Sequence, residues 1–77
     1  GHPDYETRAA ILRGIATHRA LDVPADQLDE LARYEFTNVR ELQGALNRLA
    51  AQRALGDHDV SVAEIARALG VALPGQG

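Results

Sequence analysis

A chain of 77 residues forms one small domain, close to the size at which a single hydrophobic core is barely sufficient. It contains no cysteine, which excludes disulfide bonds and thiolate metal sites, and no lysine, which excludes a phosphate-binding loop ending in Lys-Ser/Thr. The formal net charge is -3, so binding of DNA through charge alone is disfavoured.

The composition predicts an all-α fold, a small bundle of three to four helices. Ala and Leu dominate the apolar residues, β-branched and aromatic residues are few, and no stretch alternates in the manner of a strand. No apolar run approaches the roughly 20 residues that span a bilayer, and no signal-peptide pattern opens the chain. We therefore expect a cytoplasmic protein with no membrane association. Residues 1–2 resemble a tag remnant or a frayed terminus, residues 3–69 are expected to fold, and residues 70–77 are expected to form a flexible tail.

The first predicted helix covers residues 5–20, with Asp4 as its N-cap. Its inward face is expected to comprise Ala9, Leu12, Ile15 and Ala16, flanked by Tyr5 and Ile11. Gly14 lies within this helix, where glycine lowers helix stability by about 1 kcal/mol relative to alanine. It is read either as tolerated variation or as a point of close contact with a neighbouring helix. His18 is expected on the exposed side.

The second predicted helix covers residues 25–34 and starts after Pro24, whose missing N–H costs nothing at that position. Its inward residues are Leu28, Leu31 and Ala32. The polar residues Asp26, Asp29, Glu30 and Arg33 share the other face, which favours a solvated surface over a metal site. Phe36 follows in the turn at residues 35–37 and is predicted to fill the junction with the next helix.

The third predicted helix is the clearest one and extends to about Leu55. Asn38 is a suitable N-cap, and Glu41 stands three residues later at capping-box spacing. One apolar face is formed by Val39, Leu42, Ala45, Leu46 and Leu49. Arg40 lies in the first turn, off that face, where a cation opposes the helix dipole. A residue placed against local preference is a hint of function.

A turn at residues 56–59 precedes a short fourth helix. Asp57, His58 and Asp59 are metal-ligand types, but three adjacent residues in a turn rarely converge on one ion, so a solvated turn is favoured. Residues 61–64 (Ser-Val-Ala-Glu) form a capping box that starts a helix ending at Leu69, with Gly70 as its C′ residue. The inward residues of this helix are expected to be Ile65, Ala66 and Leu69.

Three segments of this chain resemble the lid subdomain of DnaA-like AAA+ replication initiators. They are residues 3–8 (PDYETR) followed by Ile11-Leu12, residues 21–24 (LDVP) and residues 38–46 (NVRELQGAL), in the same order and spacing. The last segment resembles the sensor II helix of that family. Residues 35–36 (Glu-Phe) depart from the pattern, which has an aliphatic residue and then a small polar one.

The resemblance implies a lid that packs over a nucleotide held by an AAA+ base domain of the same chain. It implies that Arg40 reaches the phosphates and that Val39 contacts the adenine–ribose side. ATP or ADP with Mg²⁺ is then a cofactor of the full-length parent protein and not of this fragment alone. The implied partners are the base domain and neighbouring subunits of a nucleotide-dependent oligomer, with DNA bound through other parts of the parent.

Three other interpretations differ from a nucleotide-sensing lid. Residues 62–71 resemble the first helix and turn of a helix-turn-helix motif, but Leu-Pro-Gly-Gln-Gly follows where a recognition helix is needed. In the family, the matching segment resembles the linker helix that leads out of the ATPase module.

An enzyme acting alone is disfavoured, since His18 and His58 supply no catalytic constellation. The third alternative is a helical interaction or regulatory module that keeps the lid fold without sensing nucleotide, favoured by the departure at residues 35–36.

Overall fold

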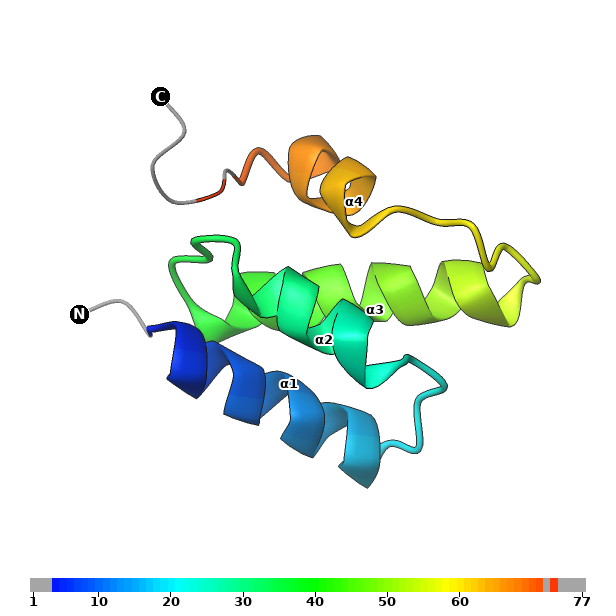
Figure 1. Cartoon of the computed structure of the whole chain (residues 1–77), viewed down its shortest axis with the longest axis horizontal. Helices are drawn as coiled ribbons and strands as arrows, with labels where there is room; N and C mark the ends of the chain where they lie inside the picture. The colour runs from blue at the N-terminus through cyan, green and yellow to red at the C-terminus, as the bar shows by residue number, and fades with distance from the viewer. Residues whose placement is uncertain (1–3, 72, 74–77) are drawn as a thin grey trace.

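The computed structural model describes residues 4–71 and 73, and these contain four helices and no strand. In chain order they are α1 (Tyr5–His18), α2 (Ala25–Ala32), α3 (Val39–Ala54) and α4 (Val62–Ala68). Figure 1 shows α1 and α4 on opposite sides of the pair formed by α2 and α3. α2 and α3 each contact the other three helices. The prediction of a small all-α bundle is confirmed.

The core is built mainly from the apolar faces predicted for the four helices, and it also contains Tyr34, Val60 and Val62, which were not predicted to face inward. Its largest fully buried side chains are Phe36, Leu12, Leu31, Leu42, Leu46 and Leu49. Several alanines are also buried in the core, among them Ala9, Ala32, Ala45 and Ala66. Phe36 is only 1% exposed, as expected for a residue that fills the junction between α2 and α3. Aliphatic burial of this kind is the main favourable contribution to folding.

Three side chains cap the helices as the sequence predicted. The Thr7 N–H donates to Asp4 Oδ1 at 2.8 Å, and the Glu41 N–H donates to Asn38 Oδ1 at 2.9 Å. Ser61 Oγ accepts from the N–H groups of Ala63 and Glu64 at 3.1 and 3.4 Å. Each of these bonds satisfies a helix N–H that has no partner inside the helix.

α1 and α2 both end two residues before the positions predicted for them. After α1, Ala20 adopts a left-handed conformation with φ of 52°, and the Leu21 N–H returns to the Ala16 carbonyl at 2.9 Å. This Schellman-type ending stops the helix at His18. At the end of α2, the Tyr34 N–H donates to Leu31 O at 3.2 Å, a tighter i to i−3 bond, and the Tyr34 side chain is buried.

The predicted burial is wrong at two positions, Val39 and Leu69. Val39 belongs to the predicted inward face of α3, but it is 44% exposed. It is the first residue of the helix, and the buried face of α3 starts only at Leu42. Leu69 is 39% exposed at the C-cap of α4, where the helix no longer faces the core. Of the two interpretations of Gly14, tolerated variation is supported and close contact with a neighbouring helix is not, because a Cβ added there would meet nothing within 4 Å.

The chain after α4 continues to pack against the bundle. Val71 and Leu73, in the segment expected to be a flexible tail, are half-buried and contact the hydrophobic core. Residues 1–3, 72 and 74–77 lie outside the described part of the structure, as does the expected remnant at residues 1–2. Among the described residues, no helix has the length and apolar character needed to cross a membrane.

Leu46→Ala should destabilise the domain by about 2–5 kcal/mol, since Leu46 is fully buried at the centre of α3 and its loss leaves a cavity. Leu55→Ala is the matched control, because Leu55 is 87% exposed and should change stability by less than about 0.5 kcal/mol. Thermal melts of both variants measure the difference. A Leu46→Ala melting temperature within a degree or two of wild type would contradict this account of the core.

Candidate functional site

The first turn of α3 is held by a short network of polar side chains. Asn38 caps the helix, and Glu41 reaches back one residue beyond it. Glu41 Oε1 accepts from the Thr37 N–H at 3.1 Å and from the Thr37 hydroxyl at 2.7 Å. The expected capping box is therefore modified. Asn38 caps the helix as predicted, but the Glu41 side chain bonds to Thr37 and not to the N–H of Asn38.

This network favours the ionised form of Glu41 and fixes the direction of its side chain. The hydrogen bonds from the Thr37 hydroxyl and then the Thr37 N–H lower the pKa of the Glu41 carboxyl below its ordinary value of 4.5. A carboxylate in the first turn also interacts favourably with the positive end of the helix dipole. Because Glu41 turns toward Thr37, the acid adjacent to Arg40 in the sequence is not its ion-pair partner.

Arg40 is exposed in the first turn of α3 and makes no hydrogen bond or ion pair with any residue that the structure describes. Val39, beside it, is 44% exposed. Gly44 lies one turn further along the face of Arg40, and the space above its Cα is open. We refer to Val39, Arg40 and Gly44 as the α3 patch. Both sequence-predicted site residues, Arg40 and Val39, therefore lie together on the surface.

The eight arginines of the chain, Arg40 included, divide into two groups. Within residues 4–71 and 73, four of the eight arginines donate to other elements, namely Arg8, Arg13, Arg19 and Arg53. The remaining four make no such bond to the described residues: Arg33, Arg40, Arg48 and Arg67. Among these four, Arg40 alone lies in the first turn of a helix.

The chemistry available at the α3 patch is recognition of an anion. A guanidinium stays charged at all physiological pH values and offers forked N–H donors that match a phosphate or carboxylate. Its position at the positive end of α3 adds to the local attraction for negative charge. All three residues of the patch are exposed and belong to one helix, so a ligand held there would need a second surface to enclose it.

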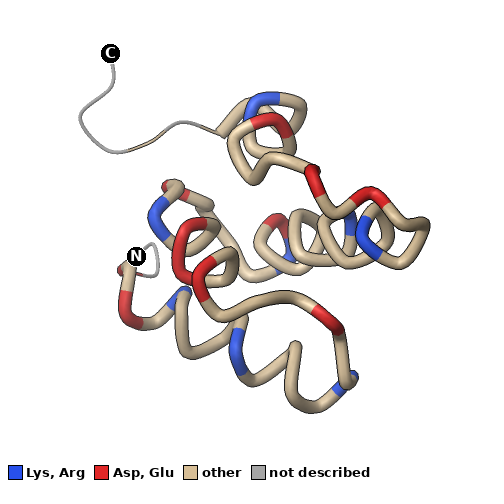
Figure 2. Tube along the Cα trace, turned by 45° about the vertical axis from the view of Figure 1, so that its right-hand side comes forward, with Lys and Arg blue, Asp and Glu red and all other residues tan. Residues whose placement is uncertain are grey.

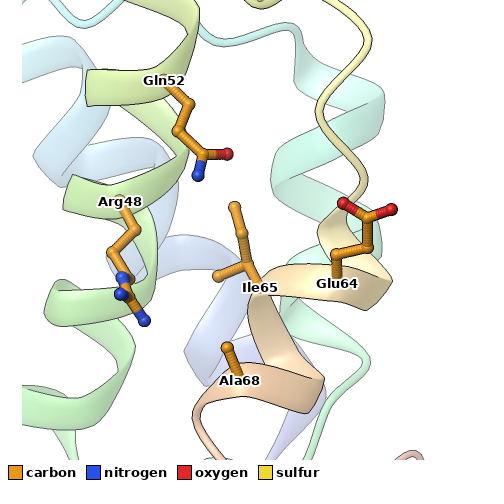
Figure 3. A pocket seen from close by; sticks show the side chains of 5 residues that line it. All are labelled: Arg48, Gln52, Glu64, Ile65 and Ala68. Atoms are coloured by element: carbon orange, nitrogen blue, oxygen red, sulfur yellow. The ribbon is translucent and has the colours of Figure 1, made fainter.

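Two cavities lie away from the α3 patch. The first, about 110 Å³, lies between α3 and α4 and is lined by Arg48, Gln52, Glu64, Ile65 and Ala68. Figure 3 shows Arg48 and Gln52 reaching from α3 toward Ile65, with the Glu64 carboxylate pointing away. This space suits a few water molecules and is smaller than an ordinary ligand pocket of roughly 300–1,000 Å³.

The second cavity, about 350 Å³, is an open groove between α1, the α1–α2 loop and α2. It is lined by Arg13, Ala16, Thr17, Leu21, Val23, Ala25 and Leu28. Arg13, the one charged side chain in this lining, already pairs with Asp29 at 2.6 Å, so its charge is partly compensated within the chain.

The acidic residues of α2 form a solvated surface, as predicted. Figure 2 shows acidic positions along α2 and in the turn between α3 and α4. Asp26 and Glu30 are exposed, and Asp29 is engaged by Arg13. Among the described residues, no group of three His, Asp or Glu side chains is placed to hold a metal ion. His18 is exposed on α1, as expected.

Sequence reasoning missed the inward position of Arg8 and the role of Thr37. Arg8 is buried and donates from Nε to the Ala32 carbonyl at 2.7 Å. The signal for its burial was present, because Arg8 stands four residues before Leu12 on the inward face of α1. The sequence gives no comparable indication of the bond between Thr37 and Glu41, because the spacing of Asn38 and Glu41 predicts an ordinary capping box.

Comparison with known proteins identifies relatives with one shared description, "Chromosomal replication initiator protein DnaA". The Deinococcus deserti protein is 43% identical over 67 residues, 87% of this chain and 15% of the relative. The Thermus thermophilus protein is 45% identical over the same share of each. The Chloroflexus aurantiacus protein is 42% identical over 87% of this chain and 14% of the relative.

The chain is therefore homologous to a segment of DnaA, and it spans about one seventh of the length of the curated relatives it matches. No family model matches the sequence. No solved structure matches it either.

Thr37→Val should raise the pKa of Glu41 toward its ordinary value, because the substitution removes the hydroxyl donor and keeps the backbone N–H. A lowered folded-state pKa stabilises the fold above the ordinary pKa, and that contribution is lost as the pH falls through the folded-state pKa. Thr37→Val should weaken this pH-dependent part of the stability. NMR titration of the Glu41 carboxyl carbon measures the pKa.

Thr17→Val is the control for this titration, because Thr17 is exposed on α1 and should leave Glu41 unchanged. An unchanged Glu41 pKa in Thr37→Val would show that the hydroxyl bond does not hold the first turn of α3 in solution.

Proposed function

We propose that this chain is the nucleotide-sensing lid of a DnaA-like AAA+ ATPase that acts in ATP-dependent initiation of chromosomal replication. The observation that supports the proposal most strongly is Arg40, an exposed arginine without a partner among the described residues, in the first turn of α3. It lies in a chain that is 42–45% identical to segments of DnaA. The parent protein is the full-length initiator of which, in this proposal, the chain is a part.

In this proposal the α3 patch faces a nucleotide held by the AAA+ base domain of the same parent chain. Arg40 contacts the phosphates, because its guanidinium is charged and available. Val39 lies toward the adenine–ribose side. The base domain supplies the phosphate loop and the acid that binds Mg²⁺, so ATP or ADP is bound by the parent and not by this chain alone. ATP hydrolysis, where it occurs, is an activity of the parent.

The lid orientation then depends on which nucleotide is bound. When Arg40 makes or loses its contact with the phosphates, the lid rotates. This rotation couples the nucleotide state to assembly of neighbouring subunits. DNA is contacted by other parts of the parent, consistent with the net charge of -3 on this chain. The compartment we propose is the cytoplasm.

The second candidate is a helical interaction or regulatory module that keeps the lid fold without sensing nucleotide. The observation that favours it is the pair Glu35 and Phe36, where the chain departs from the family pattern. Phe36 is 1% exposed and Glu35 is exposed, so the departure lies in the turn just before the α3 patch and places one of its two side chains in the core. Nucleotide measurements on the parent distinguish the two candidates.

Arg40→Ala should leave the stability of this chain within about 0.5 kcal/mol of wild type, because Arg40 is exposed and makes no bond to the described residues. In the parent, the same change should remove a charge-assisted phosphate contact of about 1.5–3 kcal/mol, roughly a 10- to 100-fold effect. The effect is expected in ATP affinity, hydrolysis or nucleotide-dependent assembly. Thermal melts of the chain and titration, turnover and assembly assays of the parent measure it.

Arg67→Ala is the matched control, since Arg67 is another exposed arginine without a partner among the described residues and lies on α4. It should leave all three parent assays unchanged. A parent carrying Arg40→Ala that matches wild type in all three would remove Arg40 from the site and favour the regulatory module.

Gly44→Ala should stabilise this chain by about 0.5–1 kcal/mol, because Ala has the higher helix propensity and its Cβ meets nothing within 4 Å. Gly14→Ala is the matched control, an exposed mid-helix glycine with equally open space. If the α3 patch closes over a nucleotide, Gly44→Ala should weaken ATP binding by the parent, whereas Gly14→Ala should not. Equal ATP affinity in both variants would show that nothing approaches Gly44 closely in the parent.

A further inference from the structure

A buried guanidinium connects α1 to the end of α2. Arg8 is 6% exposed and is the one charged residue buried in the described part of the chain. Its Nε–H donates to the carbonyl of Ala32, the last residue of α2, at 2.7 Å. A buried cation is tolerated only where its donors are satisfied, so this bond constrains both helices.

α2 has no polar cap of its own. It is eight residues long, its N-cap is Pro24 with no side-chain hydrogen bond, and its last turn contains no basic residue. At its C-terminal end, which carries the negative end of the helix dipole, the Glu30 and Leu31 carbonyls accept from the backbone N–H groups of the turn that follows. The last carbonyl, that of Ala32, accepts instead from the side chain of Arg8, which therefore supplies from α1 a charged side-chain donor that α2 does not supply itself.

The end of α2 leads directly into the turn that starts α3. Tyr34 and Phe36 are both buried in this turn, and the Phe36 N–H donates to the Tyr34 carbonyl at 2.9 Å. Asn38 then caps α3, and Arg40 follows in its first turn. Figure 1 shows the start of α1 and the start of α3 at the same end of the bundle. The position of the Ala32 carbonyl therefore helps to set where the turn, and then Arg40, leaves the core.

We propose that Arg8 is a positioning residue for Arg40. By holding the C-terminal end of α2, it fixes the turn at residues 33–38 and so the direction in which the Arg40 guanidinium is presented to a nucleotide phosphate. This inference rests on the proposed function, since it assigns Arg8 a task at that same site. A general contribution of Arg8 to stability would lower the folded fraction without changing the affinity of the folded molecules.

The first test uses this chain alone and needs no nucleotide. Arg8→Met keeps much of the apolar stem and removes the donor to Ala32, so backbone ¹⁵N order parameters at residues 33–41 should fall from about 0.85 to below about 0.6. Val62→Ala, a buried substitution in α4, is the control and should leave residues 33–41 rigid. Unchanged order parameters in Arg8→Met would overturn the proposal.

Arg8→Lys provides the same comparison if Arg8→Met does not fold. Lysine keeps a charged donor but lacks the Nε group that bonds to the Ala32 carbonyl. Order parameters at residues 33–41 should again fall, by less than in Arg8→Met. Wild-type values throughout the turn would contradict the assignment.

The second test is a double-mutant cycle in the parent, read as ATP affinity of the folded protein by calorimetry. Arg8→Met should weaken ATP binding at least threefold, and Val62→Ala should not. If Arg8 acts through Arg40, Arg8→Met should cause no further loss in a parent that already carries Arg40→Ala. Fully additive losses would overturn the proposal.

The two tests separate failure of this inference from failure of the proposed function. If Arg40→Ala alone changes no nucleotide property of the parent, the proposed function is wrong. The order parameters of this chain then still decide whether Arg8 holds the turn. If Arg40→Ala weakens ATP binding and Arg8→Met does not, the proposed function stands and the positioning role is rejected.

Discussion

Burial of one face of α3 is the constraint on which the rest of the structure depends. Leu42, Leu46 and Leu49 are fully buried, and they recur at the spacing that keeps one side of a helix against the core. Because α3 contacts all three other helices, this buried side fixes its rotation about its own axis. The opposite side then has to face outward. Arg40 and Gly44 are therefore exposed as a direct result of the packing of the leucines.

The helices and their starts could be predicted from sequence because they are set by local chemistry. Asp4, Asn38 and Ser61 each bond to an N–H group two or three residues later, so the signal lies within one turn of the chain. The core positions follow from periodicity for the same reason. The exposure of Arg40 was likewise predictable, since it lies off the apolar face. Its role in nucleotide sensing remains a proposal that neither periodicity nor spacing tests.

The features that could not be predicted depend on contacts between segments far apart in the sequence. The bond from Arg8 to the Ala32 carbonyl joins α1 to the end of α2, and no local pattern specifies its partner. α2 ends early because Tyr34 turns into a core built by other helices. Val39 belongs to the apolar series of α3 but lies at the start of the helix, before the residues that pack on the core. Periodicity alone therefore predicted that it would be buried.

The local arrangement at the start of α3 explains how a small domain can keep an arginine at an unfavourable position. A cation in the first turn opposes the helix dipole, at a cost of about 0.3–1 kcal/mol. Glu41 offsets this cost, because it places a carboxylate in the same turn and accepts two hydrogen bonds from Thr37. An ion pair between Glu41 and Arg40 would also balance the charges, but it would occupy the guanidinium. By bonding to Thr37 instead, Glu41 stabilises the turn while the donors of Arg40 remain available to an anion outside the chain.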